Sequence, residues 1–461
     1  MEVIKLVIQI IMGIASSLVA LMSIVLFLQC RWPAVAMWGL KVFASALSPV
    51  FILVGLLTLV TGFATGSEFI SVIGIYVTFI YFIHIISVTR PPGTASGFEQ
   101  VFGLNWKNQI KPEQKKYFLS NRTVLKSPSV PEPRLEQNIS FATIPGTDRK
   151  LLCDVWQPPE TIKPSGLALI FMHGSAFYIL DKDFGSRPLF RHLAAQGHLI
   201  MDVAYRLAPE TNLMGMINDV KRAIVWMKEN AGRYEVDPDR IILGGGSTGG
   251  FLALMTGYTM YDSRFTPDEI QHKDIMCCAV IAEYPPTDLE ALYYHTNQHL
   301  TTRSLPGRPK KKVPAAIQAW MKKRLGEDFH RLGMDKGLEN VGTIAPLIGG
   351  HPDECPERYK FFSPATHVSS SCPPTLLIHG EHDIMAPVKS TRLLYSHLIA
   401  EKVPAILHIL PQSDHAFDRL LPSIAPAAHN VFYDIERFTA LMADKKNIQY
   451  KVMSRKEEVS V

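Results

Sequence analysis

The chain has 461 residues, of which 47% are hydrophobic and 19% charged, and its formal net charge is +5. This length can hold two or three domains, and the apolar content excludes a wholly disordered protein. A small positive charge gives no support to nucleic-acid binding, and no aromatic–basic RNA motif is visible. The six cysteines contain no C-x-x-C pair, so neither a metal site nor a disulfide framework is expected.

Three long apolar segments lie near the N-terminus, at residues 6–28, 42–64 and 69–88. Each matches the roughly 20 residues that a helix needs to cross the hydrocarbon core of a bilayer. A signal peptide would have a shorter apolar core, of about 7–15 residues, and a small-residue cleavage site. We therefore predict a membrane region over residues 1–92 with three transmembrane helices, or two if the first lies in the interface.

Three spans would put the N-terminus and the turn at residues 66–68 on one side of the membrane. Residues 31–41 and everything after Arg90 would lie on the other side. That second side carries more basic residues: Arg31, Lys41, Arg90, Lys107 and Lys111. Because cytoplasmic loops are enriched in Lys and Arg, we expect an integral membrane protein with its large C-terminal part in the cytosol. Nothing indicates which membrane.

A glycine cluster follows a short apolar segment at residues 241–243 and precedes an apolar helical pattern. Within it, Gly245-x-Ser247-x-Gly249 has the spacing of a nucleophile elbow. A serine on a sharp strand-to-helix turn needs small neighbours, and the helix N-terminus that follows stabilises negative charge. Taken alone, these residues are equally compatible with a glycine-rich turn that contains an incidental serine.

From residue 139 onward, strand-like and helix-like segments alternate. The strand-like segments are 151–156, 167–172, 199–204, 241–243, 280–283, 375–379 and 405–410, and the helical ones are 189–196, 219–228 and the residues after Gly249. This alternation predicts an α/β fold, with a mostly parallel sheet covered on both faces. A small-residue loop begins at His173, directly after one of these strands, and could point backbone N–H groups at a reacting carbonyl oxygen.

Six sequence blocks occur in the order of a known enzyme family. They are the loop at 173–174, residues 205–210, the elbow, residues 284–288, residues 380–383 and residues 415–417. Over about residues 139–442 the chain thereby resembles the α/β hydrolase fold-3 family, the hormone-sensitive-lipase-like carboxylesterases, and most of all its membrane-anchored microbial members. The resemblance implies a doubly wound, mostly parallel sheet with a helical lid, and a serine hydrolase that needs no cofactor.

Carried over residue by residue, Ser247 would be the nucleophile, Asp383 the acid and His415 the base. His415 would take the serine proton and return it to the leaving group, while Asp383 would fix its tautomer and stabilise the imidazolium. The order of the three residues along the chain is that of α/β hydrolases. The alternatives at neighbouring positions are Glu381 and Asp414 for the acid, and His379 and His382 for the base.

The same resemblance assigns the oxyanion hole to the backbone N–H groups of Gly174, Ser175 and Thr248. The chain departs from the family twice. The usual His-Gly-Gly-Gly loop has Ser175 and Ala176 at its last two positions, and the usual acidic–alanine pair around the nucleophile is Gly246 and Thr248. The backbone donors survive both changes. Serine and alanine reach positive φ less readily than glycine, so catalytic rate and substrate preference stay open.

The sheet pattern is interrupted at about residues 288–361, which resemble a lid insertion over the acyl pocket. The predicted domains after the membrane region are a linker with part of the lid at 93–138, the catalytic domain at 139–445, and a polar tail at 446–461. We expect part of residues 107–135 to join the lid. The insertion could also be a structural elaboration without a role in the pocket.

The leading hypothesis is a membrane-anchored serine esterase that cleaves a lipophilic or small acylated substrate through an acyl-enzyme. An amidase or deacetylase on an N-acyl small molecule is an alternative, as is a catalytically silent α/β-hydrolase binding module. The expected partners are the ester substrate and membrane lipid. From the family we also expect Arg206 and Glu210 to form a pair that holds their loop. Acyl length and oligomeric state are not indicated.

Overall fold

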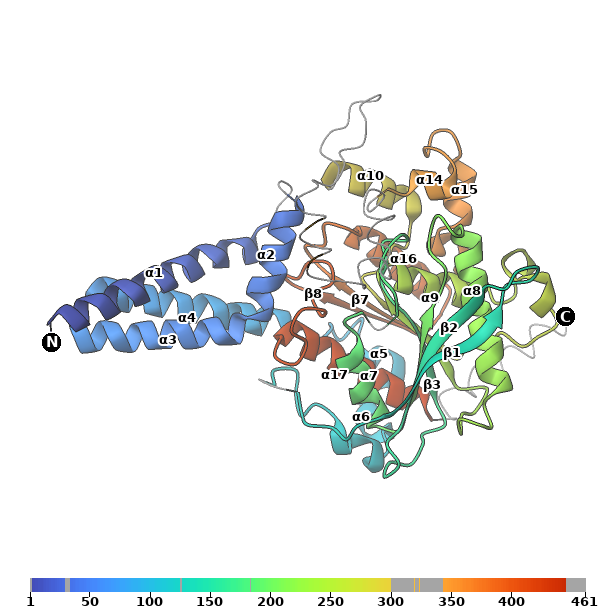
Figure 1. Cartoon of the computed structure of the whole chain (residues 1–461), viewed down its shortest axis with the longest axis horizontal. Coiled ribbons are helices and arrows are strands. Elements are labelled where there is room, and N and C mark those ends of the chain that lie inside the picture. The colour runs from blue at the N-terminus through green and yellow to red at the C-terminus, as the bar shows by residue number, and fades with distance from the viewer. Residues whose placement is uncertain are drawn as a thin grey trace.

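The computed structural model describes residues 2–29, 34–124, 127–182, 184–299 and 343–444, together with residues 319 and 323. Most of the centre of the predicted lid and the whole predicted tail at 446–461 lie outside these residues. The described chain forms a bundle of N-terminal helices and an α/β domain (Figure 1).

The N-terminal region consists of helices α1 (Glu2–Phe27), α2 (Ala34–Ala46), α3 (Ser48–Thr65) and α4 (Glu68–Val88). Helices α1, α3 and α4 run side by side and extend away from the α/β domain (Figure 1). Glycines let α3 and α4 approach closely, since a Cβ on Gly74 would lie 2.4 Å from the backbone nitrogen of Leu59. Of the helices that the structure describes, these three are long and apolar enough to cross a membrane.

The second apolar segment, predicted as one span over 42–64, is divided at Leu47 between α2 and α3. Pro49 explains the division, because a residue without an N–H group is tolerated only in the first turn of a helix. Residues 42–46 therefore belong to α2, and the described part of the expected loop at 31–41 is helical. Figure 1 shows α2 crossing the end of the bundle where it meets the α/β domain.

The α/β domain is built on an eight-stranded sheet in the order β1-β2-β4-β3-β5-β6-β7-β8. The strands are β1 (Arg134–Thr143), β2 (Lys150–Gln157), β3 (Ala168–Met172), β4 (Leu199–Ala204), β5 (Ile241–Gly246), β6 (Ala279–Glu283), β7 (Thr375–Gly380) and β8 (Ala405–Leu410). Strand β2 is antiparallel to β1 and β4, and the other pairs are parallel. The predicted α/β-hydrolase architecture is confirmed, although the domain begins at β1, before residue 139.

Helices cover both faces of the sheet. One face carries α8 (Leu213–Glu229), α9 (Thr248–Tyr258) and α16 (Val388–Ala400), and the other carries α7 (Arg187–Ala194) and α17 (Pro426–Met442). Successive side chains of a strand point to opposite faces. Ile170 and Met172 of β3 accordingly pack in the first core, and Leu169 and Phe171 in the second. This double burial accounts for the uninterrupted apolar run in the sequence of β3.

The remaining elements are short. They are α5 (Phe98–Phe102), α6 (Trp106–Gln109), η1 (Pro112–Tyr117), η2 (Ser263–Phe265), η3 (Asp268–Ile270), α10 (Leu289–His299), α14 (Ala345–Ile348), α15 (Pro356–Phe361) and η5 (Pro364–His367).

The segment after α4 packs on the α17 side of the sheet. The rings of Phe98 and Trp106 stack with their centroids 4.6 Å apart inside that core. Arg122 donates hydrogen bonds to Asn430 (2.6 Å) and Asp434 (2.5 Å) of α17. No described residue of 93–138 lines the cavity presented below. Apolar side chains of this segment, such as Ile110 and Leu119, are buried in the core that contains α17. That part of residues 107–135 joins the lid stays a prediction.

Candidate active site

Four loops meet at the edge of the sheet where its parallel strands end. Ser247 follows β5 directly, Asp383 lies after β7, and His415 lies after β8. The loop that begins at His173 follows β3. Because parallel strands have their carboxyl ends at one edge, segments far apart in the sequence converge there.

Ser247 occupies a strained turn between β5 and α9, with φ of 56°. A Cβ on Gly245 would lie 2.4 Å from the carbonyl oxygen of Met172, and a Cβ on Gly249 only 1.9 Å from it. Glycine is therefore required at both positions. The backbone N–H of Ser247 donates to the carbonyl of Glu283 at 2.8 Å, which fixes the turn against β6.

The structure brings the three predicted catalytic residues into contact. Ser247 Oγ lies 2.9 Å from His415 Nε2, and His415 Nδ1 lies 2.8 Å from Asp383 Oδ2. These distances allow a proton to pass from the serine hydroxyl to the imidazole while the carboxylate holds the other ring nitrogen.

Asp383 is held by several donors. Its Oδ1 accepts hydrogen bonds from the backbone N–H groups of Met385 (2.8 Å) and Ala386 (2.7 Å). Its Oδ2 also lies 3.2 Å from Nε2 of the buried His379. Burial alone would raise the pKa of Asp383, but His415 and the hydrogen bond from His379 outweigh it and keep the pKa below its ordinary value. The group is thus an ionised carboxylate at neutral pH.

The alternative acids lie elsewhere. Asp414 Oδ1 accepts hydrogen bonds from the backbone N–H groups of Ile384 (3.0 Å) and His415 (2.7 Å). Burial and the charge of Asp383 raise the pKa of Asp414 to about 6. Glu381 is exposed. Among the described carboxylates, Asp383 is the one that contacts the imidazole of His415.

The loop after β3 brings Gly174 and Ser175 beside the elbow. A Cβ on Gly174 would lie 3.4 Å from the Cβ of Ser247. Among the residues that the structure describes, neither Gly174 nor Ser175 uses its backbone N–H in a hydrogen bond. Both groups are therefore available to a ligand at Ser247, as an oxyanion hole requires.

The two departures from the family pattern meet at one backbone donor. The backbone N–H of Phe177 is shared between Ser175 Oγ at 3.0 Å and Thr248 Oγ1 at 3.2 Å. Tyr205 Oη lies 2.9 Å from the same Ser175 hydroxyl. Ala176 adopts a positive φ of 45° without being glycine. The two hydroxyl groups thus tie the loop to the elbow and hold its unusual backbone.

The triad opens on a cavity of about 640 Å³, a size typical of small-molecule sites. Most of its lining side chains are apolar. The described ends of the predicted lid contribute Leu292 and Ile344, and α2 contributes Trp38, Gly39 and Val42. A segment that the sequence assigned to a transmembrane span and its loop thus forms one wall of the cavity.

Comparison with known proteins identifies the family. The family model BD-FAE matches residues 153–323 and 326–398, more than half of the chain. The chain belongs to the BD-FAE family of hormone-sensitive-lipase-like α/β hydrolases.

The individual curated relatives have low sequence identity to this chain. The chain is 28% identical over 289 residues to the probable carboxylic ester hydrolase LipM of Mycobacterium tuberculosis, covering 62% of this chain and 57% of LipM. It is 28% identical over 288 residues to esterase LipC of the same organism, covering 62% of each protein. The chain thus spans about three fifths of the length of these curated relatives. The solved structure of esterase B from Lactobacillus rhamnosis, at 16% identity, has a TM-score of 0.49 and covers 70% of this chain and 90% of that one.

Sequence reasoning missed the contacts of α2 with the loops after β7 and β8 in this member of the BD-FAE family. Trp38 Nε1 donates a hydrogen bond to the backbone carbonyl of His415 at 2.7 Å. Lys41 Nζ lies 2.6 Å from Nδ1 of His382. Burial and the charge of Lys41 lower the pKa of His382 to about 4, so this histidine is a neutral acceptor. The signal that could have separated α2 from the span is Pro49.

A buried ionic network beside the elbow was also missed. Arg419 Nη2 lies 3.3 Å from the Glu283 carboxylate, and its Nε donates to Tyr284 Oη at 2.9 Å. Tyr284 Oη in turn donates to Asp418 at 2.7 Å. A Cβ on Gly246 would lie 2.8 Å from both Arg419 Nη2 and Tyr284 Oη. The network therefore occupies the space of the side chain that the family usually carries at this position.

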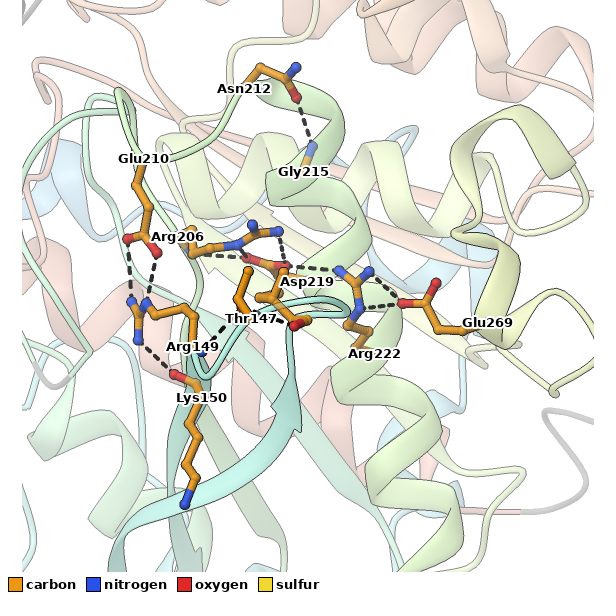
Figure 2. Close-up of polar contacts among 11 residues, drawn as sticks. Thr147, Arg149, Lys150, Arg206, Glu210, Asn212, Gly215, Asp219, Arg222 and Glu269 are labelled. Carbon is orange, nitrogen blue, oxygen red and sulfur yellow. Dashed lines mark hydrogen bonds and ion pairs between the residues drawn. The ribbon is translucent and has the colours of Figure 1, made fainter.

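The predicted pair of Arg206 and Glu210 is wrong. Arg206 binds Asp219 through its Nε (2.8 Å) and its Nη2 (2.7 Å), whereas Glu210 pairs with Arg149 at 2.7 Å (Figure 2). Asp219 is fully buried, so its charge requires a bidentate partner. Glu210 is exposed, so solvent as well as Arg149 stabilises its charge.

Proposed function

We propose that the protein is a membrane-anchored serine hydrolase that cleaves carboxylic esters through an acyl-serine intermediate. The observation that carries this proposal is the continuous contact from Ser247 Oγ through His415 to the ionised Asp383, at the wall of an apolar cavity. The names of LipM and LipC, a probable carboxylic ester hydrolase and an esterase, favour esters over amides.

The proposed reaction has two halves. Ser247 Oγ attacks the ester carbonyl carbon while its proton passes to His415 Nε2. The carbonyl oxygen becomes an oxyanion beside the backbone N–H groups of Gly174, Ser175 and Thr248. When the tetrahedral intermediate collapses, the bond to the leaving oxygen breaks, His415 protonates that oxygen, and the alcohol departs. Water then attacks the acyl-serine with His415 as base, which releases the carboxylic acid and regenerates the hydroxyl of Ser247.

Membrane anchoring is supported by the surface of α1, α3 and α4. Large apolar side chains such as Leu53, Phe63 and Phe69 are at least 60% exposed. Contiguous apolar surface of this kind is rare in soluble proteins, and a bilayer would cover it. The excess of Lys and Arg after the last span assigns the catalytic domain to the cytosolic side in this proposal.

An activity-based probe tests the chemistry. A fluorophosphonate should label the full-length protein, because it reacts with activated serines, and Ser247→Ala should abolish both labelling and ester hydrolysis. Ser263→Ala, at an exposed serine outside the cavity, is the matched control and should keep both. Labelling that persists in Ser247→Ala would contradict the assignment.

Protease protection tests the orientation. In sealed microsomes, everything beyond Arg90 should be digested without detergent if the domain is cytosolic. The acceptor sequences at Asn121 and Asn138 should stay unglycosylated, although both asparagines are exposed. Protection of the domain, or glycan on either asparagine, would put it in the lumen.

A further inference from the structure

Helix α2 differs from the three helices around it. It has 13 residues, too few to cross a bilayer, and it lies across the end of the bundle beside the α/β domain (Figure 1). Its one charged residue, Lys41, is 3% exposed and donates a hydrogen bond to the carbonyl of Leu28 at 2.7 Å. The outward side of α2 therefore carries no charge.

The two sides of α2 have distinct contacts. Trp38, Gly39 and Val42 face the cavity and are called here the α2 wall. On the outside, Leu40 is 37% exposed and Phe43 is 42% exposed. Phe184, which also lines the cavity, is 46% exposed. Leu40 and Phe43 lie on α2 next in sequence to the residues of the α2 wall. These three side chains are called here the apolar rim, and their exposed surface prefers hydrocarbon to water.

Polar contacts fix α2 relative to both the bundle and the catalytic loops. His84 of α4 contacts Ser45 of α2 through Nε2 (2.9 Å) and Gln412 through Nδ1 (2.8 Å). Gln412 lies three residues before His415, whose carbonyl accepts the hydrogen bond from Trp38. These contacts thus fix the orientation of the cavity relative to α4, one of the helices proposed to lie in the membrane. If they cross a bilayer, α2 lies at its interface, as an uncharged apolar helix face favours.

We propose that the cavity is a site for a long aliphatic chain and that it is filled from the bilayer. The substrate is an ester whose hydrocarbon chain leaves the membrane over the apolar rim and packs along the α2 wall, with its carbonyl carbon at Ser247. Each methylene group buried against the wall strengthens binding. This inference rests on the proposed ester hydrolysis and adds the class of substrate and its route.

Gly39 offers a direct test of the chain site. A Cβ at this position meets no atom within 4 Å, so Gly39→Leu can extend into the cavity without displacing the fold. With the full-length protein in nanodiscs, the ratio of kcat/KM for p-nitrophenyl palmitate to that for p-nitrophenyl acetate should fall by about tenfold or more. Gly232→Leu is the matched control, because Gly232 is exposed, equally open and outside the cavity, and should keep the wild-type ratio.

An unchanged ratio in Gly39→Leu, or equal losses on both esters, would overturn the chain site. Failure of the proposed function has a different signature, since the wild type would then hydrolyse neither ester and would not react with a fluorophosphonate.

Phe43 tests the route. Phe43→Lys puts a charge on the rim but not on the wall. With protein and palmitate ester in phosphatidylcholine vesicles, the ratio of KM for this ester to KM for the water-soluble acetate should rise about fivefold. Leu393→Lys, a change of the same kind at a 49% exposed position of α16, should leave the ratio unchanged. Equal KM ratios in the wild type and Phe43→Lys would overturn entry from the bilayer.

Discussion

The cavity has two walls that are held in place in different ways. At the carboxyl edge of the sheet, backbone geometry fixes the proposed nucleophile: Gly245 and Gly249 abut the carbonyl of Met172, and Ser247 has a positive φ. Across the cavity, α2 is positioned by side chains, through Trp38 to the His415 carbonyl and through Lys41 to His382.

This difference separates chemistry from access. A change at the sheet edge alters where reacting atoms lie, and a fraction of an ångström matters for proton transfer and nucleophilic attack. A change in α2 alters what fills the cavity or how firmly the helix is docked. Losses of activity should therefore be large at the first wall and selective at the second, and the following variants are ordered from the largest expected effect to the smallest.

Ser247→Ala and His415→Ala should each lower kcat by about 10⁴–10⁶, because nucleophile and base act as a unit. The double variant should be little worse than either single one. Steady-state kinetics on one ester, with circular dichroism to check folding, measures this. Multiplicative losses in the double variant would mean that the two residues do not cooperate.

Asp383→Asn should lower kcat by about 10³–10⁴, since the amide cannot stabilise the His415 imidazolium. Asp414→Asn is the matched control: its amide oxygen can still accept from Ile384 and His415, so a loss within about tenfold is expected. If Asp414→Asn, or Glu381→Gln, costs more than Asp383→Asn, the acid has been assigned to the wrong residue.

Ser175→Pro should lower kcat by about 10²–10³, because it deletes one backbone donor of the proposed oxyanion hole. Ser175→Gly keeps that donor and loses the hydroxyl contacts with Phe177 and Tyr205, so its activity should stay within about tenfold of wild type. A collapse in the glycine variant would assign the substrate contact to the hydroxyl itself. Both are compared at saturating ester.

The smallest expected effect concerns the docking of α2. The pKa of His382 is about 4 when it is buried beside Lys41, and about 6.5 for a free imidazole. Between these values the unfolded chain binds a proton that the folded protein does not, so stability falls as the pH is lowered from about 6.5 to about 4. In His382→Gln the thermal midpoint should fall less steeply over this window. Equal slopes would mean that His382 stays solvated.

Features that follow from a short sequence pattern could be predicted from the sequence, whereas the ion-pair partner of a side chain could not. The elbow was predictable because the glycine spacing around Ser247 is the signature of this turn, although the atom that excludes a side chain there belongs to Met172 of β3. Strand β3 was predictable because its burial on both faces imposes a continuous apolar run. Arg206 was paired with Glu210 by resemblance, but the partner it selects is the carboxylate that cannot be solvated, Asp219. Helix α2 was not predicted as a separate helix, because hydropathy does not distinguish a helix side that faces lipid from one that faces a cavity.

The division of the second apolar segment at Leu47 bears on how this protein should be prepared. A soluble version that began after α4 would keep the triad, the sheet and the oxyanion loop. It would also lose Trp38, Gly39 and Val42, together with the hydrogen bond to the His415 carbonyl. Such a version would keep the proposed triad but lack one wall of the cavity. Substrate profiles measured on it would describe the exposed edge of the sheet rather than the full-length protein.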